Sequence, residues 1–435
     1  MRRDISFTDA LRVWLKIGFL SFGGPAGQIA LMHRILVEEK RWIGEQQFLY
    51  ALNYCMLLPG PEAQQLATYI GWLLHRTLGG LVAGLLFILP GLAVVLGLSV
   101  LYALFHETAI LNSIFYGLKP VVLAIVGLAL WRLSMRAIRS SFHSILAVAA
   151  FLALFVFNLP FPLVILAAGV SGLIRYWIYE RNGTAIISPA PSSPRENPDN
   201  TSGKSWLAVV LACLVIWIVP VIWIGLAKGW HSTLGEVGIF FSKMAVVTFG
   251  GAYAVLSYVG QQAVSRYGWL SPDDMINGLA MAETTPGPLI LVLSFVAFMA
   301  GYNSDGSLIT GLGTSLFATL VTFAPCFLFI FAGAPFIERL RGNQLAASAL
   351  SAVTAAVVGV IANLGVWFAL TVLFKTTTAL SFYGISPRIP VWSSLDVAAF
   401  VLSILALAAL HWWRWNLGVV LVLGGLAGLV ITRVF

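Results

Sequence analysis

The sequence predicts an all-α, polytopic integral membrane protein built from two inverted-topology repeats. Three observations lead to this prediction. The 435 residues are 59% hydrophobic and only 10% charged, against about 25% charged in ordinary soluble domains. Thirteen apolar runs are close to the length of about twenty residues that spans a bilayer as a helix. Finally, a pattern of lysine, glycine, tryptophan and proline recurs 227 residues further along the chain.

Six of the predicted spans precede a polar linker and seven follow it. The first six lie near residues 10–31, 46–74, 78–105, 109–131, 143–158 and 160–179. The other seven lie near residues 205–227, 233–262, 274–300, 307–333, 345–374, 395–411 and 416–432. We therefore expect an N-terminal transporter repeat over 1–180, a linker over 181–204 and a C-terminal repeat over 205–435. The linker is rich in Pro, Ser and Asn, which predicts disorder, and the C-terminal repeat begins with one extra transmembrane helix.

The distribution of charge predicts the orientation of the chain. The first residues, MRRDISFTDALRV, carry charges and lack a short apolar core with a cleavage site, so the first span is expected to be retained. With a cytoplasmic N-terminus, 15 of the 25 basic residues fall in inside loops and 7 in outside loops. This bias follows the positive-inside rule. It explains the net charge of +8 without a nucleic-acid partner, and it favours a multi-pass membrane protein with a cytoplasmic N-terminus.

An internal repeat relates the two halves. At an offset of 227 residues, some forty-five positions align without a gap. Identical pairs include Lys16 and Lys243, Phe22-Gly23-Gly24 and Phe249-Gly250-Gly251, Trp42 and Trp269, Leu52 and Leu279, and Pro59-Gly60-Pro61 and Pro286-Gly287-Pro288. An odd number of spans between the copies turns the second copy upside down. Inverted repeats with helix breakers at matching positions are typical of secondary transporters, whose site lies at the repeat interface.

The glycine and proline motifs predict broken helices that form an anion site. Irregular backbone at membrane depth is tolerated where it is buried in protein or lines a wet cavity. Pro25, Pro61 and Pro288 are expected to begin half-helices, and Ala252 stands where Pro25 would recur. The N-terminus of a half-helix offers free N–H groups and a positive dipole end. The alternative is that the glycines only let two helices pack closely.

Three lysines fall within apolar segments and are candidate ligands of the anion. Lys16 and Lys243 occupy equivalent positions, six residues before each pair of glycines. Ionisable residues inside a membrane are costly and usually functional. The alternative for Lys16, which has Arg12 one turn away, is a side chain that extends to the membrane interface. Lys119 precedes a proline and has no counterpart in the second copy.

Two carboxylates are predicted deep in apolar segments, Glu62 after the first Pro-Gly-Pro and Glu283 before the second. Either is a candidate for carrying a coupled proton, because an ionised carboxylate beside a bound dianion repels it and a protonated one does not. For Glu62, the alternative is that it only complements the dipole at the start of a helix.

Motifs of other protein classes are missing from the sequence. The three cysteines suggest no disulfide framework, and the six histidines show no metal-ligand spacing. There is no Walker loop, serine-triad elbow or HExxH motif. We therefore expect no cofactor and no enzymatic activity; a membrane enzyme acting on lipid-linked substrates is the alternative from another class.

At these motifs the sequence resembles the chromate ion transporter family. The resemblance is carried by FGGPAGQIALMHRILVEEKRWI and LLPGPEAQQLATYIGWLL in the first half, and by TFGGAYAVLSYV and AETTPGPLILVLSFVAFMAGY in the second. It covers both halves, as in the long, two-domain form of the family. It implies efflux of chromate from the cytoplasm and chromate resistance, driven by the proton gradient or the membrane potential.

Other transport activities stay open at this point. Sulfate is a tetrahedral dianion of similar size to chromate, so a sulfate or general oxyanion transporter is the main alternative, and a passive anion channel is another. The expected partners are a chromate or sulfate-like dianion and the lipid bilayer. A homodimer is compatible with the sequence.

Overall fold

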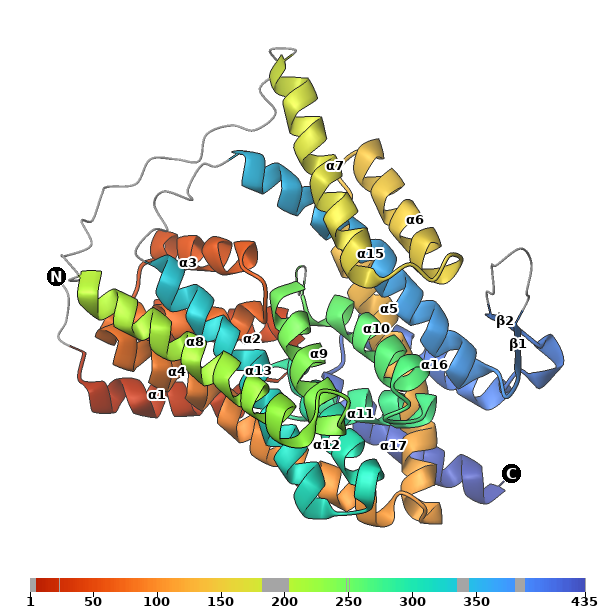
Figure 1. Cartoon of the computed structure of the whole chain (residues 1–435). Coiled ribbons are helices and arrows are strands. Elements are labelled where there is room, and N and C mark those ends of the chain that lie inside the picture. The colour runs from red at the N-terminus through yellow and green to blue at the C-terminus, as the bar shows by residue number, and fades with distance from the viewer. Residues whose placement is uncertain are drawn as a thin grey trace. The chain divides into compact units, whose positions relative to one another are not determined.

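The structure, a computed structural model, describes residues 5–22, 24–181, 203–247, 249, 251–334, 344–379 and 388–434. Within these ranges nearly every residue is helical (Figure 1). The exceptions are loops and one two-stranded antiparallel sheet of β1 (Thr377–Ala379) and β2 (Arg388–Pro390). The predicted all-α class is confirmed. The predicted linker lies outside the described residues, apart from its two ends.

A helix or a pair of helices covers each of the thirteen apolar runs. The N-terminal half contains α1 (Phe7–Leu20), α2 (Gly24–His33), α3 (Glu45–Leu57), α4 (Glu62–Phe105), α5 (Ala109–Ala137), α6 (Ser141–Phe155) and α7 (Phe161–Arg181). The C-terminal half contains α8 (Gly203–Lys228), α9 (Thr233–Val247), α10 (Ala252–Gln261), α11 (Pro272–Thr284), α12 (Val292–Asp305), α13 (Leu308–Gly333), α15 (Gln344–Leu373), α16 (Val397–His411) and α17 (Leu417–Val434). Four predicted spans, 10–31, 46–74, 233–262 and 274–300, are interrupted at their glycine or proline motifs.

Helix α4 changes direction within its length. His75 and Arg76 have non-helical backbone angles, with φ −137° and φ 53°. They separate the stretches predicted as the end of one span and the beginning of the next. A Cβ atom added to Gly71 would overlap the backbone of Gly79. The two arms therefore pack closely because both positions lack a side chain.

Six helices are long and apolar enough to cross a membrane, among the described residues. They are Glu62–Phe105, Ala109–Ala137, Phe161–Ile178, Trp206–Lys228, Leu308–Gly333 and Gln344–Leu373. The Trp206–Lys228 segment of α8 has a mean hydropathy of 3.0 and none of that window is buried. Large apolar side chains exposed to this degree are stable when lipid is the solvent. These helices confirm a polytopic membrane protein.

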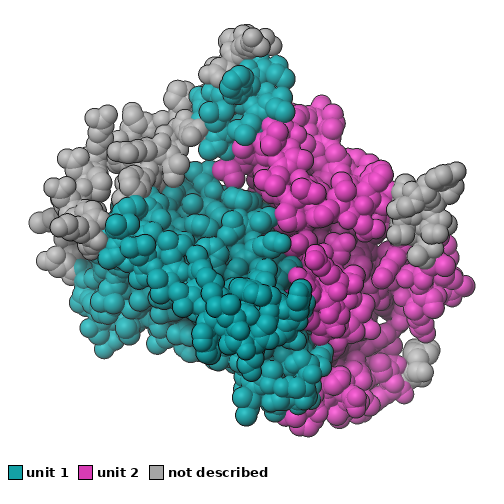
Figure 2. All heavy atoms as spheres, viewed as in Figure 1, with its two compact units in different colours: residues 1–96, 173–252, 285–348 teal, residues 97–172, 253–284, 349–435 magenta. Residues whose placement is uncertain are grey.

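The chain forms two compact units, and each contains segments of both sequence halves (Figure 2). Unit 1 comprises residues 1–96, 173–252 and 285–348. In unit 1, α13 packs against α12, α9 and α8. Two tryptophans of α8 make polar contacts there: Trp206 Nε1 donates to Phe331 O at 3.1 Å, and Trp217 Nε1 to Ser242 Oγ at 3.1 Å.

Unit 2 comprises residues 97–172, 253–284 and 349–435. Its central helix α5 packs against α16, α17 and α11. A Cβ atom added to Gly117 would overlap the backbone of Gly424 and Gly428, so α5 and α17 approach through glycines. Tyr116 Oη donates to the Asp396 carboxylate at 2.9 Å. The contacts therefore divide the chain differently from its two sequence repeats.

Candidate anion-binding site

The four predicted breaks contain glycines with left-handed backbone angles. Gly24 and its counterpart Gly251 have φ +74° and +97°, and Gly60 and its counterpart Gly287 have φ +122° and +90°. Side chains of L-residues are strained at these angles, which is why glycine occupies all four positions. The repeated sequence motif thus produces the same backbone irregularity in both copies.

The backbone between the breaks also repeats. Helices α2 and α10 each continue into a π-helical turn, Arg34–Glu39 and Gln262–Arg266. Beyond each turn, Trp42 N donates to Leu36 O at 2.8 Å, and the equivalent Trp269 N donates to Ala263 O at 2.8 Å. Helices α3 and α11 then cover identical positions at the 227-residue offset. The two copies therefore share their local conformation as well as their residues.

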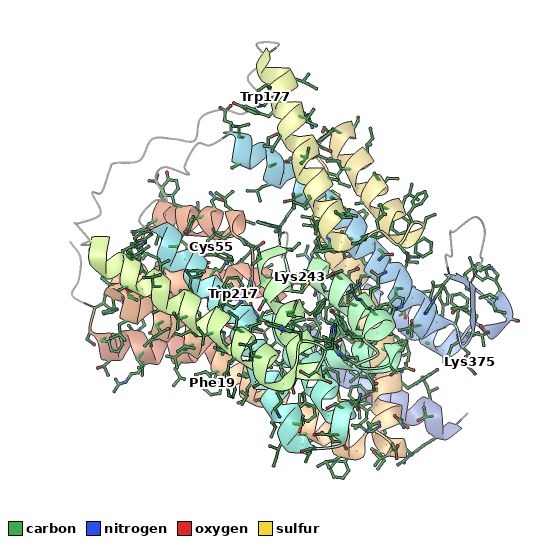
Figure 3. The ribbon with its side chains drawn as sticks, in the orientation of Figure 1. Phe19, Cys55, Trp177, Trp217, Lys243 and Lys375 are labelled. Atoms are coloured by element: carbon green, nitrogen blue, oxygen red, sulfur yellow. The ribbon has the colours of Figure 1, made fainter. Side chains whose placement is uncertain are left out.

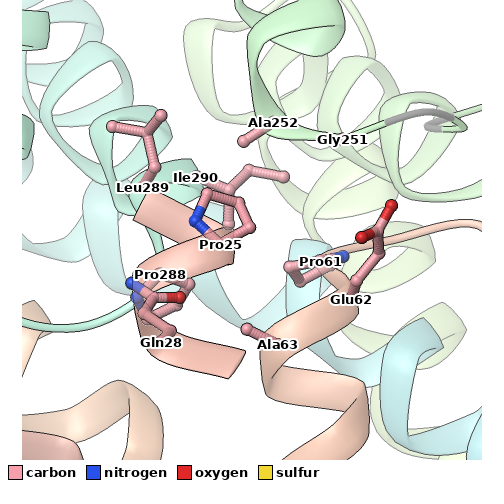
Figure 4. A pocket seen from close by; sticks show the side chains of 10 residues that line it. All are labelled: Pro25, Gln28, Pro61, Glu62, Ala63, Gly251, Ala252, Pro288, Leu289 and Ile290. Carbon is pink, nitrogen blue, oxygen red and sulfur yellow. The ribbon is translucent and has the colours of Figure 1, made fainter. Parts of the chain in front are cut away.

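A pocket lies within unit 1 where breaks from both copies meet (Figure 4). It is lined by Pro25 and Gln28 of α2, Pro61, Glu62 and Ala63 at the start of α4, Gly251 and Ala252 at the start of α10, and Pro288, Leu289 and Ile290 before α12. Eight of these residues form four equivalent pairs: Pro25 with Ala252, Pro61 with Pro288, Glu62 with Leu289, and Ala63 with Ile290. The pocket therefore has approximate internal symmetry, which the pair of Glu62 and Leu289 breaks.

The pocket is narrow, and the backbone dominates its electrostatics. The room left between its walls is about that of one water molecule. Helices α4 and α10 begin at the lining residues Glu62 and Ala252, and α2 begins at Gly24, next to the lining residue Pro25. The first N–H groups of a helix lack intrahelical acceptors and carry the positive end of the dipole. Glu62 is the charged residue among the ten that line the pocket, and none is basic.

Two hydrogen bonds join the first break of copy one to the second break of copy two. Gly287 N donates to Ser21 O at 2.8 Å, and Gln28 Nε2 donates to Gly287 O at 2.6 Å. Ser21 and Gln28 are 0% and 1% exposed. Ser21 Oγ also donates to Ile17 O at the end of α1, at 2.6 Å. The N–H and C=O groups at a helix break have no partner within their own helix. Side chains and the opposing break supply hydrogen-bond partners for these groups here, as burial in a membrane requires.

The structure brings together only part of the predicted site. Pro25, Pro61, Glu62, Gly251 and Pro288 line the pocket. Gly24, Pro59, Gly60, Pro286 and Gly287 belong to the same breaks without lining it. Phe22 is 48% exposed, and Phe249 is half-buried. Gly23 and Gly250 lie outside the described residues.

The predicted lysines are not among the lining residues. Lys16 is exposed on α1, on the side of Leu15 and Phe19 rather than of the buried Trp14 and Ile17. Lys243 is exposed on α9 (Figure 3).

Lys119, on α5 in unit 2, forms an ion pair with Asp273 at the start of α11. A neighbouring carboxylate stabilises a lysine in an apolar helix. The sequence offered the signal in PDD at 272–274, two acidic residues at the start of a helix.

The two candidate glutamates belong to different units. Glu62 is half-buried at the first residue of α4 and lines the pocket of unit 1. Glu283 is 4% exposed near the end of α11 in unit 2. Its carboxylate accepts a hydrogen bond from Tyr253 Oη at 2.7 Å.

Gln28 and Ser21 are site residues that the sequence reasoning missed. Both lie in the motif SFGGPAGQIA that was used to predict the break. A glutamine inside an apolar membrane segment is itself a signal, because an unpaired amide there is costly. That signal was available but went unused beside the glycines and proline.

The fold and this pocket define a class: polytopic α-helical membrane proteins whose two repeated halves contribute matching broken helices to one site, the architecture of secondary transporters. The family model of chromate transporters matches residues 8–173 and 235–429. The chain therefore belongs to the chromate transporter family.

Similar proteins occur in several bacteria. The chain is 30% identical over 438 residues to the chromate transport protein of Pseudomonas aeruginosa, covering 98% of this chain and 93% of that protein. It is 28% identical over 376 residues to the chromate transport protein of Cupriavidus metallidurans, covering 84% of each. A probable chromate transport protein of Synechococcus elongatus is 25% identical over 364 residues, covering 82% and 83%. No solved structure matches the chain significantly.

We predict that Gly24→Ala and Gly251→Ala reduce transport to a similar degree. Each introduces a Cβ at a left-handed position that has no neighbouring atom within 4 Å, so the effect comes from backbone strain of about 1–2 kcal/mol. Transport by reconstituted protein and thermal stability in detergent are the measurements. Gly97→Ala, in helix α4 with free space around it and no positive φ, is the matched control. Unchanged transport by both variants would show that the breaks tolerate another conformation.

Proposed function

We propose that this protein is a secondary transporter that exports chromate from the cytoplasm across the bacterial inner membrane and confers chromate resistance. The observation that carries the proposal is the pocket lined by equivalent residues of both copies, at the beginnings of three helices. Relatives named chromate transport proteins support chromate as the substrate. The family membership indicates transport rather than catalysis. A sulfate or general oxyanion transporter is the alternative, since the N–H groups of helix starts donate hydrogen bonds to any tetrahedral oxyanion.

Uptake into inverted membrane vesicles tests both the substrate and the direction. Export from the cytoplasm becomes uptake in this orientation, so radiolabelled chromate should accumulate when the vesicles are energised. Sulfate in excess serves as competitor, and vesicles without the protein are the control. Accumulation of chromate that sulfate does not reduce supports the proposal. Accumulation of labelled sulfate without chromate would favour the alternative.

We propose that the two sequence repeats have opposite orientation in the membrane. Their shared local backbone and the extra helix α8 before the second copy support this. Reporter fusions after Arg76 and after Tyr302 should then report opposite sides of the membrane. The same side for both would exclude inversion.

We further propose that transport is driven by the proton gradient or the membrane potential, with Glu62 or Glu283 carrying a coupled proton. Glu62 lines the pocket, and Glu283 is a buried carboxylate with the hydroxyl of Tyr253 as its hydrogen-bond donor. Glutamine at the responsible position should flatten the pH dependence of the transport rate at saturating chromate, because the amide does not titrate and saturation removes any effect of pH on chromate binding. The rate between pH 6 and pH 8 in proteoliposomes is the measurement. Unchanged profiles for both single variants and the double variant would remove both residues from this role.

Lys16 and Lys243 are proposed to attract the anion toward the pocket from outside it. Both ammonium groups are exposed, and exposed charges act on a mobile ion over roughly 10 Å at 0.1 M salt. Lys16→Met and Lys243→Met should each raise the half-saturating chromate concentration by about twofold to tenfold at low ionic strength. High salt should remove the difference. The control is Lys375→Met, an exposed lysine near β1 (Figure 3); equal effects at all three lysines would show a general charge effect.

A further inference from the structure

The amide of Gln28 has an orientation set by its neighbours. Its Nε2 atom lies 2.6 Å from Gly287 O and 3.5 Å from Ser21 O. Both neighbours are carbonyl oxygens, so the nitrogen must face them, and the reversed amide would place two acceptors against each other. The Oε1 atom therefore faces the other way, on the side of Pro61 and Ala63 (Figure 4).

This Oε1 atom is a buried acceptor with no donor among the described residues. Gln28 is 1% exposed, and its Oε1 has no hydrogen-bond partner. A buried amide oxygen without a donor costs about 1–3 kcal/mol. Because Gln28 lines the pocket, a ligand with an O–H group would supply the missing donor. A fully deprotonated oxyanion has no such group and would meet Oε1 as a second acceptor.

Glu62 also favours a protonated anion over a fully deprotonated one. It is the titratable residue among those lining the pocket, and the Cys55 thiol of α3 lies near it. An ionised Glu62 repels a dianion more strongly than a monoanion. The pocket thus combines N–H donors from helix starts with one neutral and one acidic acceptor, and it has no basic side chain among its lining residues. This set of groups fits an anion of one charge that carries one hydrogen.

We propose that the pocket of unit 1 binds the singly protonated form of a tetrahedral oxyanion when its walls move apart, since the room between them in this structure is about that of one water molecule. Gln28 Oε1 accepts the hydrogen bond from the anion's hydroxyl, and the N–H groups at the helix starts donate to its other oxygens. The inference rests on the proposed function and deepens it, because it names the transported species as hydrogen chromate.

The protonated form also explains how one oxyanion is selected over others of the same shape. Chromate takes up a proton near neutral pH, whereas sulfate and selenate, the anions of strong acids, do not. Selenate matches chromate closely in shape and size. A site that needs the O–H group therefore discriminates chemically where size discriminates little. A singly charged anion also loses less hydration energy than a dianion on entering a narrow pocket.

Binding of chromate and selenate to the purified full-length protein in detergent tests the proposal. Calorimetric titrations at pH 6, 7 and 8 should show that chromate affinity falls by about tenfold for each pH unit once the dianion predominates. Selenate should bind weakly and equally at each pH. If both anions bind with the same affinity and the same pH dependence, the proton resides on the protein and this inference is overturned, while the proposed function stands. Binding of neither anion would overturn both.

The variant Gln28→Leu removes the acceptor Oε1, and the ratio of its chromate affinity to its selenate affinity is a second measurement that tests the proposal. The substitution should lower chromate affinity by about tenfold or more and bring the chromate-to-selenate affinity ratio close to one. Because the variant also loses the bond to Gly287, the ratio decides rather than the absolute affinity. Gln64→Leu is the matched control: Gln64 is also a buried glutamine with an unpartnered Oε1, but it does not line the pocket. An unchanged ratio in Gln28→Leu overturns the proposal, and if that variant does not fold, the wild-type titrations still decide.

Discussion

Unpaired backbone groups at membrane depth are the constraint on which this structure depends. A helix that stops inside a bilayer leaves N–H and C=O groups that water cannot reach and lipid cannot bind. The protein meets this constraint by placing breaks of the two copies together, so that Ser21 O accepts from Gly287 N and the Gln28 amide binds Gly287 O. The two breaks thus satisfy part of each other's backbone hydrogen bonding.

The repeat explains the pocket's symmetry, and its departures from symmetry give the pocket its chemistry. Equivalent residues such as Pro61 and Pro288 shape both sides alike. Glu62 and Gln28 of the first copy line the pocket. Their equivalents in the second copy are the apolar residues Leu289 and Val255. Two copies with one conformation thus build a site in which only one side carries polar side chains.

Polar contacts in unit 2 show how apolar helices accommodate ionisable residues. Lys119 pairs with Asp273, Tyr116 donates to Asp396, and Tyr253 donates to Glu283. In each case residues distant in sequence meet across packed helices. Close approach of α5 and α17 through Gly117 and Gly428 brings the helices near enough for such packing. These polar contacts supply the specificity that apolar contacts lack in a lipid solvent.

The sequence by itself determined the all-α membrane class, the places where helices break and the family, because hydropathy and the glycine and proline motifs act locally. Glycine permits the positive φ that Gly24 and Gly251 adopt. Which residues face the pocket was decided only by tertiary structure. Lys16 and Gln28 are both polar residues within apolar segments, yet Lys16 is exposed and Gln28 is buried. Which way a side chain points depends on how its helix packs against others distant in sequence, and no local pattern encodes that packing.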